Sequence, residues 1–96
     1  GGAYHLGSNA IYKNVLFSGN KATGGAVYNN GSNSTFTNVT ISGNGGYNGA
    51  IFNSVSSPVV KNCILWGNIL PFNDTQSITT NSIVEGGYPG IGNLSI

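Results

Sequence analysis

The stretch NVTISGN at residues 38–44 decides the fold of this chain, because it recurs in two related forms at a fixed step. NVLFSGN occupies residues 14–20 and NCILWGN occupies residues 62–68, so the first, second and third copies begin at a constant step of 24. A fixed period between about 20 and 50 residues is typical of solenoids, in which each repeat covers the apolar face of its neighbour. The sequence therefore predicts a repeat architecture.

Each repeat contains residues with the alternating pattern of β-strands. In the second repeat, two extended segments are expected at residues 26–29 and 35–41, and the latter (TFTNVTI) alternates apolar and polar side chains. Such segments can stack in parallel about 4.8 Å apart, with right-handed crossovers. The prediction is an all-β, right-handed parallel β-helix of about four coils of about 24 residues, forming a single segment over residues 1–96. The expected coils are roughly 1–23, 24–48, 49–74 and an irregular last coil, 75–96.

The two ends of the chain depart from the regular pattern. NSIVEG at residues 81–86 echoes NCILWG at residues 62–67, but it follows at a step of 19 rather than 24. The last coil is therefore expected to be shortened or to have a rearranged loop. At the other end, the chain opens inside a repeat, so we expect it to be a piece of a longer protein or a chain whose leader was removed.

The fixed step between the repeats assigns side chains to columns that run along the stack. Three columns should point inward: Tyr12, Phe36 and Val60; Val15, Val39 and Cys63; Phe17, Ile41 and Leu65. Two further columns are expected: small residues at Ala3, Ala26 and Ala50, and an aromatic column in which His5 joins Tyr28 and Phe52. Cys63 has no second cysteine to pair with and is interpreted as a small buried hydrophobe.

Asparagine fills two polar columns. They are Asn14, Asn38 and Asn62, and Asn20, Asn44 and Asn68. An amide side chain both donates and accepts hydrogen bonds, so amides stacked at strand spacing can form a ladder that stabilises the turns. The alternative is a polar row that binds a ligand or ordered water.

Composition excludes several classes of function. The chain has three lysines, two acids, no arginine and a net charge of +1, which gives no field to attract nucleic acid. One cysteine and one histidine cannot build a zinc site, and two acids are too few for a calcium cage. Lys13 and Lys61 share a column with Thr37 and are interpreted as a solvated face. No apolar run is long enough to insert into a membrane.

Four phrases together resemble a known kind of repeat. They are LFSGN at 16–20, GGAVYN at 24–29, SSPVVKNC at 56–63 and IVEGGYPG at 83–90. They are similar to the right-handed parallel β-helix repeats of large bacterial secreted and surface proteins, including chlamydial polymorphic outer-membrane proteins, an autotransporter family. The resemblance implies an exported protein, located extracellularly or at the cell surface. It also implies an adhesive or surface-displayed role and no cofactor.

Three functions stay open at this point. The leading hypothesis is a non-enzymatic structural or adhesive segment of an exported bacterial surface protein. The second is a carbohydrate-binding or polysaccharide-processing β-helix whose site lies on other coils; Trp66 near Glu85 is the candidate sugar contact, and Asp74 with Glu85 the only carboxylate pair. The third is a self-assembling filament subunit, because exposed strand edges invite further chains. The expected partners are other surface proteins, glycans or copies of the chain.

Overall fold

The computed structural model describes residues 2–21, 25–45, 50–68 and 77–94, and the secondary structure within them is entirely β. The strands are short, as the frequent glycine and asparagine predict. They are β1 (Ala3–Leu6), β2 (Ile11–Lys13), β3 (Leu16–Ser18), β4 (Val27–Asn30), β5 (Thr35–Thr37), β6 (Thr40–Ser42), β7 (Ile51–Ser54), β8 (Val59–Lys61), β9 (Ile64–Trp66), β10 (Ile78–Thr80) and β11 (Ile83–Val84).

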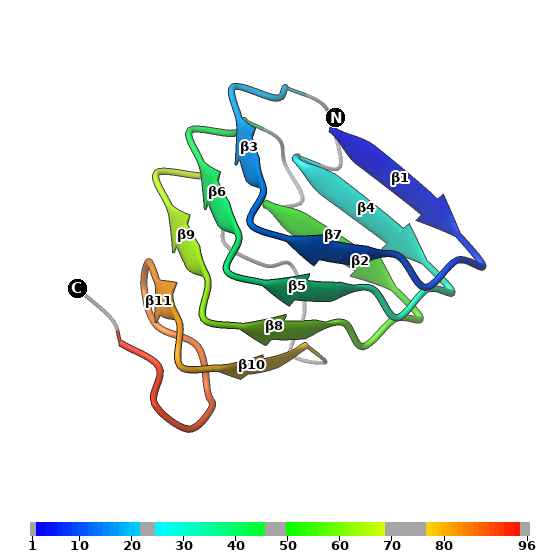
Figure 1. Cartoon of the computed structure of the whole chain (residues 1–96). Coiled ribbons are helices and arrows are strands. Elements are labelled where there is room, and N and C mark those ends of the chain that lie inside the picture. The colour runs from blue at the N-terminus through cyan, green and yellow to red at the C-terminus, as the bar shows by residue number, and fades with distance from the viewer. Residues whose placement is uncertain (1, 22–24, 46–49, 69–76, 95–96) are drawn as a thin grey trace.

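These strands form three parallel sheets, in which each of the first three repeats contributes one strand to every sheet and the last repeat contributes one strand to sheets B and C (Figure 1). Sheet A has the order β1-β4-β7, sheet B the order β10-β8-β5-β2, and sheet C the order β11-β9-β6-β3. In sheet B, Tyr12 pairs with Phe36 and Phe36 pairs with Val60, so the backbone register keeps the step of the sequence repeat. The prediction of an all-β fold with parallel strands is confirmed, and the arrangement is compatible with a β-helix.

The last repeat has a shorter step in the two sheets that it joins. Val60 pairs with Thr79 in sheet B, and Leu65 pairs with Val84 in sheet C, so both registers have the step of 19. After β11 the chain turns back, and Leu94 forms an isolated parallel bridge with Ile83. The step of 19 in the sequence is therefore also the step of the backbone register in these two sheets.

The core lies between the three sheets and contains the predicted inward columns of sheets B and C, together with Val27 and Ile51 of sheet A, which were not predicted. Phe36, Ile41, Val60 and Leu65 have no exposed surface, and Cys63 is 2% exposed. Aromatic rings pack between the first two repeats, where Tyr12 stacks on Phe36 with ring centroids 5.2 Å apart. Because each strand places alternate residues inside, the apolar residues of one column bury one another along the stack.

Residues with left-handed backbone angles separate the three strands of each repeat. Asn14, Asn38 and Asn62 have φ of 57°, 54° and 55° and connect sheet B to sheet C. This geometry corrects the predicted single strand at residues 35–41, which Asn38 divides into β5 and β6. Asparagine tolerates left-handed angles better than other residues with a side chain, so the sequence marks this corner.

The first strand corrects two predicted columns by one residue. Ala3 pairs with Val27, so Gly2 rather than Ala3 lies at the level of Ala26 and Ala50. A methyl group on Gly2 would come within 2.9 Å of the Phe17 ring, so this position has no room for a side chain. The Gly-Ala echo in the sequence had aligned Ala3 with Ala26, a step of 23, whereas the backbone register has the step of 24.

The inward and outward assignment can be tested with two substitutions. Phe36→Ala should destabilise the chain by roughly 3–5 kcal/mol, because it removes a fully buried ring from the centre of the stack. Lys13→Ala should change the free energy of unfolding little, since Lys13 is exposed. Urea denaturation gives both values, and equal midpoints would contradict the assignment.

At the corner between sheets A and B, one substitution is predicted to stabilise the chain. Gly7, Gly31 and Val55 occupy equivalent positions with φ of 60°, 59° and 50°. A β-branched residue is strained at this angle, and Val55 is 87% exposed, so little packing offsets the strain. Val55→Gly should therefore raise the free energy of unfolding by about 1 kcal/mol. Thermal or urea denaturation measures the change, and a lower stability would show that the corner is not strained at this residue.

Candidate functional site

One of the two asparagine columns forms a continuous chain of side-chain hydrogen bonds. Asn20 Nδ2 donates to Asn44 Oδ1 at 3.0 Å, and Asn44 Nδ2 donates to Asn68 Oδ1 at 2.9 Å. Asn44 is 3% exposed, and its amide also donates to the backbone oxygens of Phe17 and Ser42. These residues follow β3, β6 and β9, so the chain ties together the turns that leave sheet C.

The other predicted asparagine column has a different arrangement. Asn14, Asn38 and Asn62 are exposed, and their side chains make no hydrogen bond to another described residue. Their role is in the backbone, where their left-handed angles turn the chain from sheet B into sheet C. The exposed amide groups therefore line the outside of this corner.

A buried polar chain that runs from sheet A to Ser77, just before β10, was not predicted from the sequence. Asn29 Nδ2 donates to Asn53 Oδ1 at 2.9 Å, and Asn53 Nδ2 donates to Ser77 Oγ at 3.0 Å. Ser34 Oγ adds a bond to Asn29 Oδ1 at 2.9 Å. The signal was present, because Asn29, Asn53 and Ser77 follow one another at the same step of 24 as the repeats.

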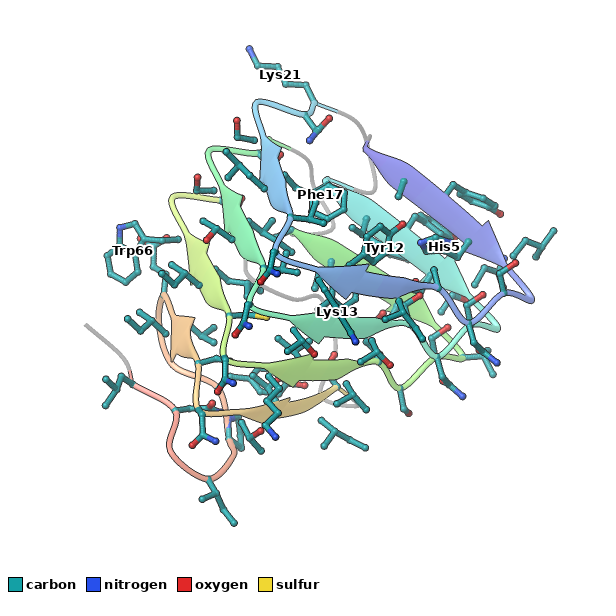
Figure 2. The ribbon with its side chains drawn as sticks, viewed as in Figure 1. His5, Tyr12, Lys13, Phe17, Lys21 and Trp66 are labelled. Carbon is teal, nitrogen blue, oxygen red and sulfur yellow. The ribbon has the colours of Figure 1, made fainter. Side chains whose placement is uncertain are left out.

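His5 belongs to this column rather than to the predicted aromatic one. It pairs with Asn29, while Tyr4 pairs with Tyr28, which in turn pairs with Phe52. A hydrogen bond joins His5 Nε2 and Tyr12 Oη at 2.6 Å, and the labelled rings lie between the sheets in Figure 2. Burial raises the pKa of Tyr12. His5 is thus the first residue of the column that contains Asn29 and Asn53, and its side chain is hydrogen-bonded to Tyr12, which packs against the core.

The exposed outer face of sheet C brings together the predicted sugar contacts. Trp66 is 37% exposed at the end of β9 and projects away from the sheets in Figure 2. Glu85 follows β11, and its backbone N–H donates to the oxygen of Leu65, so it continues the register beside Trp66. Its Oε1 accepts a hydrogen bond from the N–H of Gly67 at 2.9 Å. The turn after β9 therefore holds the Glu85 carboxylate, and the register places Glu85 level with the exposed Trp66, so the two side chains can contact a sugar ring and its hydroxyl groups.

The single cysteine is part of the core. Cys63 Sγ contacts the backbone oxygen of Lys61 at 3.2 Å, and burial raises the pKa of the thiol, while backbone hydrogen bonds partly oppose the shift. A raised pKa lowers the thiolate fraction, so this thiol is a poor nucleophile near neutral pH. The interpretation as a small buried residue agrees with these contacts.

Other reactive groups do not gather in the described part of the chain. There, no three His, Cys, Asp or Glu side chains come together as metal ligands do. Asp74, the other acid of the sequence, lies outside the described residues. The described ranges also contain no helix of the length and apolarity needed to cross a membrane.

Comparison with protein-family models, with curated proteins and with solved structures found no match to this chain.

The two asparagine columns should respond differently to substitution. Asn44→Ala should lower the free energy of unfolding by about 2–4 kcal/mol, because buried partner groups lose hydrogen bonds worth about 1–3 kcal/mol each. Asn38→Gly is the control, and its effect should be small, since glycine accepts the same left-handed angle. Urea denaturation of both variants tests this contrast, which equal losses of stability would refute.

Proposed function

We propose that the chain is a right-handed parallel β-helix segment with a structural and adhesive role in an exported bacterial surface protein. The observation that carries the proposal is the common register, because all three sheets pair the first repeat with the second, and the second with the third, at the same step of 24. Parallel strands joined by crossovers are almost always right-handed, which gives the hand. The hydrogen-bonded chain from Asn20 to Asn68 supports the proposal, since amide ladders stabilise stacked parallel strands.

A scaffold role fits the chemistry of the outward columns. Each strand places alternate residues on the outside, so the surface consists of rows of side chains at strand spacing. The chain has only two acids, and Glu85, the one in the described part, is hydrogen-bonded to a turn. Such a surface suits contact with another large molecule in the extracellular space, without a cofactor, nucleic acid or insertion into a membrane.

A second candidate function is carbohydrate binding, and one observation favours it. Trp66 is exposed beside the fixed carboxylate of Glu85 on the outer face of sheet C. An aromatic side chain offers an apolar surface to a sugar ring, and a carboxylate accepts hydrogen bonds from its hydroxyl groups. An adhesive segment and a sugar-binding segment are therefore compatible descriptions of one surface.

Retention on polysaccharides, measured together with product release, separates these functions from catalysis. The chain should be retained on at least one member of a panel of pectin, alginate, chitin and cellulose, and it should release no product with or without Ca²⁺. Clustered carboxylates are required for a calcium cage, and a positioned acid and base for hydrolysis. Product release that is abolished by Asp74→Asn or Glu85→Gln would overturn the scaffold proposal.

The same panel distinguishes the two candidate functions. Loss of retention in Trp66→Ala, with the urea midpoint unchanged, would assign binding to the Trp66 and Glu85 surface. Retention that survives this substitution would place adhesion elsewhere on the segment. No retention on any glycan or on any cell surface, by a chain that is folded, would contradict the adhesive role.

A further inference from the structure

Two of the three lysines of the chain lie in one outward column of sheet B. Lys13 pairs with Thr37, Thr37 pairs with Lys61, and Lys61 pairs with Thr80. Both lysines are exposed, whereas the two threonines are half-buried. Because one strand separates the lysines, their backbones are about two strand spacings apart, roughly 9.6 Å. The column therefore presents two cations at a fixed step with a hydroxyl group between them.

The charge of this column is not neutralised within the described part of the chain. The outward residues of sheet B are Ile11, Lys13, Thr35, Thr37, Val59, Lys61, Ile78 and Thr80, and none of them is acidic. Glu85 lies on sheet C, where its carboxylate accepts a hydrogen bond from Gly67. The two ammonium groups are therefore available to an external anion.

The surroundings of the lysines add hydrogen-bonding and apolar groups. The exposed amides of Asn14, Asn38 and Asn62 directly follow the lysine column and have no side-chain partner among the described residues. On the other side, the exposed aliphatic residues Ile11, Val59 and Ile78 share one row with Thr35, which lies between Ile11 and Val59. One strip of the surface thus offers cations, amide donors and acceptors, and aliphatic side chains in parallel rows.

We propose that this strip binds a linear acidic glycan that carries one carboxylate or sulfate on every second sugar. A sugar unit in an extended glycan is roughly 5 Å long, which is close to the strand spacing of about 4.8 Å. A glycan lying across the strands thus brings every second sugar level with a lysine, and the sugar between them meets Thr37. Its hydroxyl groups reach the asparagine amides, and its apolar ring faces contact the aliphatic row.

This inference rests on the proposed adhesive role and names the class of partner. The charge spacing carries the specificity, because a glycan charged on every sugar would place an unpaired carboxylate against Thr37. A neutral glycan would leave both lysines without a partner. The attraction occurs at an exposed surface, so it should weaken as salt rises.

Nuclear magnetic resonance titration of the whole chain with a hyaluronan octasaccharide tests the inference. Hyaluronan carries one carboxylate per disaccharide, a chitin octasaccharide is the neutral control, and a polygalacturonate octamer is charged on every sugar. We expect the largest shifts at the amides of Lys13, Thr37 and Lys61, and none at the indole of Trp66, the only tryptophan. Hyaluronan should bind more tightly than either control.

Matched variants assign the binding. The double variant Lys13→Gln/Lys61→Gln should weaken hyaluronan binding by about tenfold, because both charge contacts are lost. Lys21→Gln is the control that also removes a lysine charge; Lys21 is exposed beyond β3 and lies far from Lys13 in Figure 2. Its effect should be less than about twofold. Equal losses in the two cases, or equal binding of duplex DNA, would show general attraction of polyanions and overturn the inference.

The spectrum of the free chain separates failure of this inference from failure of the proposed function. A dispersed spectrum that is unchanged by hyaluronan would overturn the glycan site and leave the proposed β-helix standing. A spectrum without dispersed signals would overturn the β-helix proposal itself. Shifts confined to Trp66 and Glu85 would overturn the lysine site and favour the sugar contacts on sheet C.

Discussion

The backbone register between successive repeats is the constraint on which the rest of the structure depends. Once Tyr12 pairs with Phe36, the strand residues of the first repeat lie against their equivalents in the second. Each side chain must then find its packing or hydrogen-bonding partners within its own column, because its nearest neighbours are the equivalent side chains of the repeats before and after it. Apolar columns do so by mutual burial, and amide columns by donating to one partner and accepting from the other.

This constraint explains how a chain rich in polar residues can bury some of them in its interior. Asn29 and Asn53 are buried, and an unpaired buried amide would be costly. Along the stack, however, Asn29 donates to Asn53, and Asn53 donates to Ser77. The left-handed corners complete the arrangement, since they bring the three strands of each repeat onto different sheets. The outward columns are then displayed at regular spacing, which favours ligands that are themselves repetitive.

Periodicity was enough to predict the core columns of sheets B and C, but not Val27 and Ile51 of sheet A or the register of the first strand. Phe36, Ile41 and Leu65 were placed correctly because the copies at residues 14–20, 38–44 and 62–68 fix the step. Ala3 and His5 were misplaced by one residue, since the Gly-Ala echo suggested a step of 23 there. The backbone keeps the step of 24, and Gly2 has no space for a side chain against Phe17.

The candidate site was less predictable than the fold. Stacking alone could not show that Asn44 is buried and bonded along its column while Asn38 turns the chain at an exposed corner. That difference depends on the backbone angle φ at each asparagine. The residue type shows that a left-handed φ is allowed, but it does not determine which asparagines adopt it. The proximity of Trp66 and Glu85 was predictable, because the shortened step of the last repeat places Glu85 level with Trp66.

The most direct test of the central claim is the pattern of nuclear Overhauser contacts between backbone protons of neighbouring strands. The register predicts contacts from Tyr12 to Phe36 and from Phe36 to Val60 in sheet B, with the same step from Phe17 to Ile41 in sheet C. Contacts that pair β2 with β3, or β5 with β6, as antiparallel hairpins would contradict the parallel stack and every column derived from it.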